Sequence, residues 1–418
     1  MKKIAFFLLF FIFSIGYSSS FAMLNLELTR GVAGAVPIAI IPFETQGAPA
    51  ENVSAVIAHD LQNSGRFKVL NTRSGADTVL VGKVEEIGGG RYQVSFQLLD
   101  GLKNKSGSTD SSVVLTKKFT VRADELRPLA HHISDTIYQH ITGIRGIFST
   151  RLAYIVVQRS GSQARYILEV ADEDGYNPRP LLTSTDPIMS PAWSPDGKKI
   201  AYVSFENRHA SIYVEDVATG ARHLVSEYRG INGAPAWSPD GRKLALVLSK
   251  DGSPNIYILD LASHQLSQIT RDWSINTEPA WSPDGRSVIF TSNRGGGPQI
   301  YQKNLSSGSV SRLTYEGNYN ARASYTADGN HIVLLSQSGG LYNIGVLDLD
   351  TSTFRVLTNS GNDHDSPSIA PNGSMVLFGT VSSGRSVLGM AATDGSVQIR
   401  LPARDGDVQD PAWSPFLS

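Results

Sequence analysis

The sequence of 418 residues contains no cysteine. This absence excludes disulfide bonds and a lipid attached to cysteine, so stability in an oxidising compartment must come from packing alone. Charge is also scarce, since charged residues make up 18% of the chain and the formal net charge is −1. A domain that binds nucleic acid usually carries a basic surface, and this balance therefore argues against a nucleic-acid partner.

The N-terminus lacks an apolar run long enough for a membrane-spanning helix. Two lysines precede an apolar run at residues 4–15, whereas a spanning helix needs ~20 residues. The lysines, this run and a small-x-small site ending at Ala22 are typical of a secretory signal peptide. We expect residues 1–22 to be cleaved after Ala22, and a retained anchor is the less favoured alternative.

Turn-forming residues are abundant, with 39 Gly and 20 Pro, and several of them belong to a repeat. The phrase P-A-W-S-P-D-G occurs at 191–197, 235–241 and 279–285, and weaker copies keep its spacing of 44 residues. The aromatic position of the repeat is occupied by Trp193, Trp237, Trp281, Tyr325, Ile369 and Trp413. Each unit contains four short strand-like runs, which predicts one blade of a β-propeller per unit.

The S-P-D-G part of the repeat predicts a turn. Pro195 presets φ for a type I turn, Asp196 suits the next position, and Gly197 can adopt a positive φ. The aspartates are therefore interpreted as turn formers, and the tryptophans as packing between blades. The last copy stops at Ser418, and the runs at 151–157, 165–172 and 179–182 lack a motif strand. These fragments predict one shared blade that closes a six-bladed ring at residues 147–418.

Residues 23–146 follow a different pattern, which predicts a small α/β domain. A buried strand at 37–43 precedes a helix that ends at Gly65, and strands 67–70, 78–87, 91–100 and 112–121 follow. Helical spacing then extends from 123 to Gly143. A linker at 144–148 joins this domain to the propeller.

Motifs that carry catalysis or bind a cofactor are missing. The chain has no G-x-S-x-G elbow, no P-loop and no dinucleotide fingerprint after a strand. Three histidines share one predicted helix, but the spacing from 132 to 140 is not that of a zinc helix. We expect His131, His132 and His140 to be solvated or partly packed, and we assign no catalytic residue and no metal ligand.

A binding surface is predicted instead at one mouth of the propeller channel. The residues just before each motif differ between blades while the motif repeats, and such variation on a regular scaffold is how loops acquire function. Glu278, Arg322, His364, Asp365 and Asp410 are expected to converge there. Two alternatives stay open: a hydrated mouth without a ligand, and a glycosidase, lyase or sugar-binding protein with Glu278 and Asp365 as its acid/base carboxylates.

The mature N-terminus is a second candidate site. In residues 23–34, Leu24, Leu26 and Leu28 alternate with polar residues. Such a segment could add to the sheet edge of another protein, or it could be the first strand of the α/β domain.

The domain order and the motifs N-G-A-P, N-T-E-P, S-P-S-I-A-P-N-G and the terminal P-A-W-S-P make the chain similar to the TolB family, the periplasmic propeller proteins of the Tol–Pal system. The resemblance covers essentially the whole mature chain. It implies a non-enzymatic periplasmic adaptor, expected as a monomer, that maintains outer-membrane integrity and constriction during cell division. It also implies peripheral association with the outer membrane through a peptidoglycan-associated lipoprotein, Pal.

The resemblance also implies where partners bind. Pal would contact the channel face, where Ala234 and Thr277 match family positions and Ile231 replaces a frequent family histidine. TolA would bind the tail through Leu24, Leu26 and Leu28, and Pal binding would influence whether the tail is ordered. Calcium occurs in the channel in some family complexes. The predicted Pal-binding face consists of Met189, Ser190, Ile231, Asn232, Ala234, Asn276, Thr277, Glu278, Arg322, His364 and Asp365.

Overall fold

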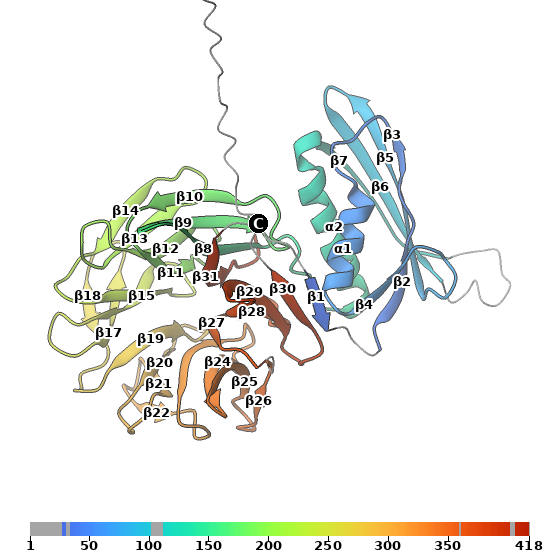
Figure 1. Cartoon of the computed structure of the whole chain (residues 1–418). Helices are drawn as coiled ribbons and strands as arrows, with labels where there is room; N and C mark the ends of the chain where they lie inside the picture. The colour runs from blue at the N-terminus through green and yellow to red at the C-terminus, as the bar shows by residue number, and fades with distance from the viewer. Residues whose placement is uncertain (1–26, 31–33, 102–111, 359–360, 402–405, 418) are drawn as a thin grey trace, which may run out of the picture.

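The computed structural model describes residues 27–30, 34–101, 112–358, 361–401 and 406–417, so the predicted signal peptide lies outside the described residues. The described chain forms an α/β domain and a six-bladed β-propeller (Figure 1). The fold class predicted from the sequence is confirmed. Among the described helices, none combines the length and the apolar character that crossing a membrane requires.

The α/β domain packs two helices on a mixed sheet. Helix α1 (Val53–Asn63) begins after Asn52, whose side chain accepts a hydrogen bond from the backbone N–H of Ala55. Helix α2 (Leu126–Thr142) follows the short helix η2 (Ala123–Glu125) and ends at Gly143, whose φ is 76°. The sheet has the order β4-β2-β5-β6-β7 with β3 beside β5, and its strands are β2 (Val36–Ile40), β3 (Glu44–Gln46), β4 (Phe67–Leu70), β5 (Thr78–Gly88), β6 (Arg91–Asp100) and β7 (Val113–Arg122).

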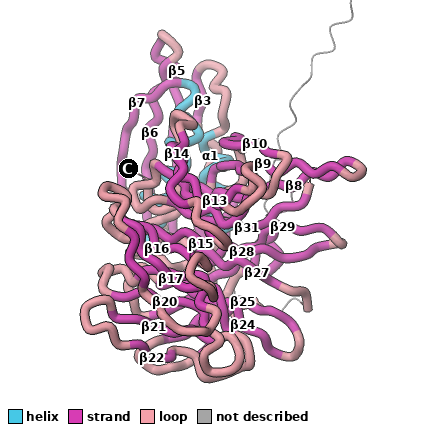
Figure 2. The backbone as a smooth tube through the Cα atoms, turned by 90° about the vertical axis from the view of Figure 1, so that its left-hand side faces the viewer, coloured by secondary structure: helices cyan, strands magenta, loops and turns pink. Residues whose placement is uncertain are grey.

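The propeller contains six antiparallel sheets, one per repeat. It consists of strands and loops, whereas the helices α1 and α2 belong to the α/β domain (Figure 2). The first blade is the shared one, and the others follow in chain order. Their strands are β8 (Arg151–Ser160), β9 (Gln163–Asp172), β10 (Arg179–Ser184) and β31 (Asp407–Trp413) in the first blade; β11 (Ile188–Trp193), β12 (Lys199–Ser204), β13 (Ser211–Asp216) and β14 (Arg222–Ser226) in the second; β15 (Asn232–Trp237), β16 (Lys243–Leu248), β17 (Asn255–Asp260) and β18 (Leu266–Gln268) in the third; β19 (Asn276–Trp281), β20 (Ser287–Ser292), β21 (Gln299–Asn304) and β22 (Val310–Arg312) in the fourth; β23 (Asn320–Tyr325), β24 (His331–Ser338), β25 (Leu341–Asp348) and β26 (Phe354–Val356) in the fifth; and β27 (His364–Ile369), β28 (Met375–Ser382), β29 (Arg385–Ala392) and β30 (Gln398–Leu401) in the sixth.

The two ends of the propeller sequence meet in the first blade. Strand β31 pairs with β8, where Trp413 faces Leu152 and Val408 faces Val156. This pairing closes the ring, as the broken motif predicted. Closure removes an edge that would otherwise expose unpaired backbone N–H and C=O groups.

The repeated tryptophans link neighbouring blades. The indole N–H of Trp237 donates to the carbonyl oxygen of Ala192 at 3.0 Å, and Trp281 donates to Ala236 at 3.1 Å. Trp193 donates to Ala412 at 3.1 Å, and this bond joins the second blade to the inner strand of the first, shared blade. The tryptophans are packed between blades, as expected, and each buried N–H finds an acceptor.

The S-P-D-G segments form the expected turns. The backbone N–H of Gly241 donates to Ser238 at 2.9 Å, and the φ of Gly241 is 70°. The Ser238 hydroxyl and the Arg242 backbone N–H donate to Asp240, and these bonds lower the pKa of this carboxyl. The motif aspartate is therefore a turn former.

The inner strands of the second to sixth blades begin at one face of the propeller and end at an S-P-D-G-type turn on the other, whereas β31 ends in the broken copy of the motif. We call these two faces the loop face and the turn face. The α/β domain and its linker contact the turn face: the side-chain amide of Asn372 donates to the backbone carbonyl oxygen of Arg145 at 2.8 Å, and Arg66 pairs with Asp394 at 2.9 Å. The loop face is therefore free of the α/β domain among the described residues.

The described part of the predicted tail is strand β1 (Glu27–Arg30), and it lies outside the α/β sheet. It pairs antiparallel with β30 and becomes the fifth strand of the sixth blade, between the two domains (Figure 1). The alternative that it is the first strand of the α/β domain is therefore wrong. Leu24 and Leu26 lie outside the described residues.

Removal of residues 410–418 is expected to open the first blade and destabilise the whole propeller, because β8 would lose part of its inner partner. The deletion leaves 407–409 paired but removes the pairing of Ala412 and Trp413 with β8 and the Trp193 bond to Ala412. The melting temperature, followed by circular dichroism, should fall by more than 10 °C, consistent with a loss of several kcal/mol. The control W413F keeps the strand and loses only the indole bond to Thr150. A truncated protein that melts like the full chain would contradict the closure role of β31.

Candidate functional site: the loop face and channel

A ring of strained residues lines the channel where the inner strands enter it. Each inner strand has a register shift just before its proline position, so the strand bulges there. At each bulge a residue other than glycine adopts a positive φ between 45° and 53°. This bulge ring consists of Ser190, Ala234, Glu278, Arg322, Ser366 and Asp410, spaced 44 residues apart.

The bulge ring has the features of a functional position. A positive φ is uncommon for residues with a Cβ atom, and such strain persists only where the surrounding structure enforces it. The neighbouring blades enforce it six times at equivalent places. All six residues line one channel cavity of about 730 Å³.

Polar contacts connect most of the ring. The Arg322 backbone N–H and Nε each donate to the Glu278 carboxylate at 3.0 Å. The Arg322 side chain also bonds Ser366, and Ser366 Oγ donates to Asp410 at 3.1 Å. Asp410 in turn accepts from the backbone N–H of Ser190 at 3.1 Å. Five of the six ring residues therefore form one chain of contacts, and Ala234 contributes an apolar position to the same ring.

The charges in the channel influence one another. Desolvation raises the pKa of Asp365, and Arg322 offsets only part of this effect. Desolvation alone would lower the pKa of Arg322, but Glu278 and Asp410 raise it, so the guanidinium stays charged. Glu278 is fully engaged, because Thr291 also donates to it at 2.8 Å. With its carboxylate held by Arg322 and Thr291, Glu278 fits a structural ion pair better than an acid/base role.

The channel does not form an oxygen cage for calcium. Arg322 places its guanidinium between Glu278 and Asp410, 3.0 Å and 3.9 Å from their carboxylates. Among the described residues, no cluster of three metal-ligating side chains occurs at the channel. The channel residues therefore fit an arginine-neutralised ring better than a calcium ion.

Three predicted site residues lie beneath the surface of the loop face. Asn232, Asn276 and His364 are all buried. Asn232 accepts from Ser226 at 2.7 Å, and His364 packs its ring edge against Phe378. These buried side chains hold the loops of the loop face in place, whereas residues next to them in the chain, such as Ile231 and Ile275, are exposed.

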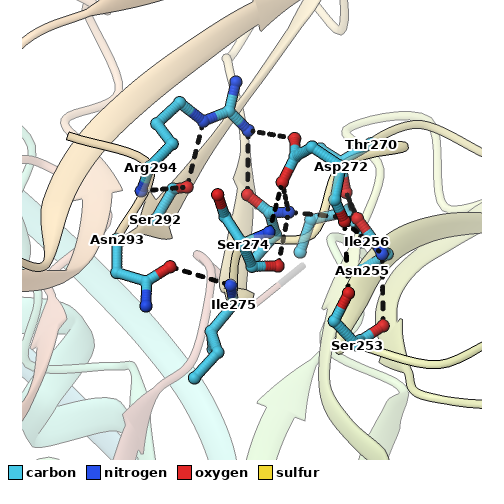
Figure 3. A network of polar contacts seen from close by, with 11 residues as sticks. Ser253, Asn255, Ile256, Thr270, Asp272, Ser274, Ile275, Ser292, Asn293 and Arg294 are labelled. Atoms are coloured by element: carbon cyan, nitrogen blue, oxygen red, sulfur yellow. Dashed lines mark hydrogen bonds and ion pairs between the residues drawn. The ribbon is translucent and has the colours of Figure 1, made fainter. Parts of the chain in front are cut away.

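The polar network that connects Asn255, Asp272 and Arg294 shows how this support works (Figure 3). Asn276 donates to Asn255 at 3.0 Å and to Asp272 at 2.9 Å, and it accepts from Arg294 at 2.8 Å. Arg294 pairs with Asp272 at 3.0 Å. The loop before β19 is therefore held on both sides, and the loop residues are pre-organised.

A second hollow on the loop face brings five predicted residues together. It lies between the second and third blades and has a volume of about 350 Å³. Met189 and Ile231 supply apolar lining next to Phe205. Ser190, Asn232 and Ala234 complete the predicted members. Thr277, Glu278 and Arg322 line the channel instead. Asp365 precedes the ring residue Ser366, and its carboxylate lies against Gly379, so the carboxyl is partly desolvated although the residue reaches solvent.

Sequence reasoning missed the most exposed aromatic residues of the loop face. The loops that join one blade to the next present Trp273, which is 94% exposed, and Tyr315, which is 73% exposed. Tyr228, Ile231 and Ile275 are also exposed on these loops. A signal was available, because Trp273 is the tryptophan that stands outside the 44-residue register. Large aromatic residues exposed on one face are typical of protein-binding surfaces.

The fold defines a class: a six-bladed β-propeller with an N-terminal α/β domain and a solvent-accessible loop face. Comparison with known proteins identifies the group within this class. The family described as the TolB beta propeller domain matches residues 138–417, and the TolB amino-terminal domain matches residues 24–74. The chain belongs to the TolB family.

Individual relatives agree with this assignment. The Tol-Pal system protein TolB of Legionella pneumophila (strain Corby) is 51% identical over 237 residues, which cover 53% of this chain and 55% of that protein. The corresponding protein of Coxiella burnetii is 50% identical over 239 residues, covering 51% and 53%. The matched region thus spans about half the length of these curated relatives. The crystal structure of TolB from Acinetobacter baumannii has a TM-score of 0.86 and 39% identity, covering 94% of this chain and 100% of that one.

Replacement of Arg322 by methionine is expected to destabilise the propeller, because Glu278, Asp365 and Asp410 would keep their charges without a cation. Channel water screens the effect to roughly 1–2 kcal/mol. Because the pKa of Asp365 is raised in the folded protein, protonation of Asp365 favours the folded state. This contribution to the free energy of unfolding is present at low pH and is lost as the pH rises through the folded pKa. The loss in R322M should therefore be larger at pH 8 than at pH 5.

Urea unfolding at both pH values measures this effect. R322K keeps the charge and is the matched control. An equal loss in R322M at pH 5 and pH 8 would contradict an electrostatic role for Arg322.

Proposed function

We propose that this protein is a periplasmic, non-enzymatic adaptor of the Tol–Pal system that binds Pal through its loop face and TolA through its N-terminal tail. Its role would be to maintain outer-membrane integrity and constriction during cell division. The observation that carries the proposal is the exposed aromatic loop face around a strained channel mouth. Family membership and the relatives' names support the Tol–Pal assignment.

The loop face has the composition of a protein-binding surface. Trp273 and Tyr315 offer large, rigid contact areas, and residues of this type dominate binding energy at interfaces. The hydrogen-bonded network beneath Trp273 holds its loop in place before binding, which lowers the entropy cost of association. Charged ring residues next to this apolar rim would add orientation and specificity.

Export through the predicted signal peptide would bring the adaptor into the compartment that contains Pal. Peripheral association with the outer membrane would follow from the lipid anchor of that partner. Contacts of the α/β domain lie on the turn face. A partner on the loop face would therefore not compete with the α/β domain for space.

The tail would be a transferable strand. Strand β1 has four residues, and its pairing with β30 includes a register shift between Leu28 and Arg30. Ordering four residues costs roughly 4–8 kcal/mol, while each hydrogen bond returns only about 0.5–1.5 kcal/mol. Such a short edge strand can exchange its partner easily. TolA would take up this segment by strand addition, and Pal binding would shift the balance between docked and free tail.

The variants Thr277→Arg and Trp273→Ala are expected to weaken Pal binding. The arginine would place a long charged side chain at the channel mouth, and the alanine would remove the most exposed aromatic contact. A loss of roughly 2 kcal/mol or more, about thirtyfold in Kd, is expected for an interface anchor of this kind. Calorimetric titration with purified soluble Pal measures the change.

Leu224→Ala is the matched control, because Leu224 is an exposed apolar residue on the outer strand β14. Circular dichroism confirms that each variant is folded. Wild-type affinity in both T277R and W273A would place Pal elsewhere, and turnover of a glycan that is lost in Glu278→Gln would replace the adaptor hypothesis.

Deletion of residues 23–34 is expected to weaken TolA binding and to retain Pal binding, because the tail pairs with the outer edge of the sixth blade, far along the sheet from its inner strand. The proposed coupling between Pal binding and tail docking would change only the affinity for Pal. A triple variant with Leu24, Leu26 and Leu28 changed to serine should behave in the same way. Its control replaces Asn25 and Thr29 by serine. Pull-down with the periplasmic part of TolA gives the measurement, and undiminished capture by the deletion variant would disprove the role of the tail.

A further inference from the structure

A second group of chemically active side chains lies at the junction of the two domains, on the turn face. His131 is on α2 and Asp60 is on α1, whereas Asp172 ends β9 and Asp174 lies in the turn that follows. A ring nitrogen of His131 and carboxylate oxygens of Asp172 and Asp174 lie within 4.8 Å of one another. The same is true of ligand atoms of His59, Asp60 and Asp174, so Asp174 belongs to both groups.

His131 is held in an orientation that suits a metal ligand. It is 3% exposed, and its Nδ1 donates to Asp60 Oδ2 at 2.9 Å. Asp60 is 2% exposed. A histidine that binds a metal usually donates its other ring N–H to a carboxylate, which fixes the tautomer and the ring orientation. The Asp60–His131 pair already has this arrangement.

Two polar atoms of the same pair lack a partner. Among the described residues, His131 Nε2 and Asp60 Oδ1 are buried and make no hydrogen bond. Buried polar atoms without partners are rare and cost about 1–3 kcal/mol each. Since Nδ1 is occupied by Asp60, Nε2 is the nitrogen available to a ligand. A cation at this place would satisfy it.

The charge balance also favours a cation. Four carboxylates surround the junction: Glu51, Asp60, Asp172 and Asp174. Arg127 pairs with Glu51 at 3.4 Å, approaches Asp172 at 3.8 Å and bonds Asp174. Arg151 also acts on Asp172, so that even with a proton on both nitrogens of His131 three positive charges face four negative ones. The buried Glu173 lies beside them.

We propose that this junction binds one zinc ion, with His131 Nε2 and the carboxylates of Asp172 and Asp174 as ligands. One imidazole and two carboxylates form a donor set that zinc accepts, with a fourth position for water. In a tetrahedral zinc site with bonds of about 2.0–2.2 Å the ligand atoms lie roughly 3.4 Å apart, so atoms that lie within 4.8 Å of one another here must approach by up to about 1.4 Å. Arg127 must release Asp174 at the same time.

The zinc ion would connect the α/β domain to the first blade. Its ligands come from α2 on one side and from β9 and its following turn on the other. Binding to the assembled junction would stabilise the relative position of the two domains. This role differs from the Pal and TolA contacts and does not depend on them.

Titration of the full mature chain with zinc chloride, in competition with a chromophoric chelator, tests the proposal. We expect one zinc ion per chain, together with a rise in melting temperature. The variants His131→Gln and Asp172→Asn should each bind zinc at least about tenfold more weakly. Arg127→Ala should bind zinc more tightly, because it removes the competing cation.

His140→Gln is the matched control, because His140 lies exposed on the same helix. A wild-type protein without saturable zinc binding, or an H131Q variant that binds zinc as tightly as the wild type, would overturn the proposal. If H131Q and D172N do not fold, wild-type crystals soaked in zinc chloride decide the question. An anomalous peak between His131 and Asp174 supports the site, and its absence at full soaking concentration refutes it.

Discussion

The pairing of β31 with β8 is the contact on which the rest of the propeller depends. It joins residues more than 250 positions apart in the chain, since Trp413 faces Leu152. Through this pairing each inner strand has a blade on both sides, and the tryptophan N–H bonds can pass from blade to blade. Because the ring is closed, the six bulges are forced to the same depth in the channel. The strain at each bulge is then distributed over a structure that cannot relax by opening.

The sequence predicted the parts of the fold that repeat. A period of 44 residues, a proline, an aspartate and a glycine define the turn, and the turn defines where each blade starts. The helix after Asn52 and the helix that ends at Gly143 were equally readable, because capping chemistry is local. Closure by the last strand was predictable because the spacing of 44 residues places a motif strand at Trp413, whereas the runs at 151–182 lack one. Local rules and a strict period are sufficient for this level of structure.

The remaining features depend on contacts that no spacing reveals. Asn276 and Trp273 stand three residues apart, yet one is a buried support and the other is almost fully exposed. His131 was expected to be solvated or partly packed, and this was wrong, because Asp60 on the preceding helix and the turn after β9 enclose it. Asp172 and Asp174 come from a different domain. Only the packing of the two domains brings them to His131, so a zinc-helix spacing rule could not detect the group.

The strand order within a blade determines which connections lie on each face of the propeller. An antiparallel blade with four strands places two kinds of connection at the loop face, namely the crossings between blades and the hairpins between second and third strands. It places the S-P-D-G turns at the other face. The turns are constrained by their own hydrogen bonds and offer a uniform platform, on which the α/β domain rests through Arg145 and Arg66. The crossings are free to vary, so the residues that distinguish one blade from the next gather where a partner can reach them. A repeat that keeps its turns constant therefore concentrates specificity on the opposite side.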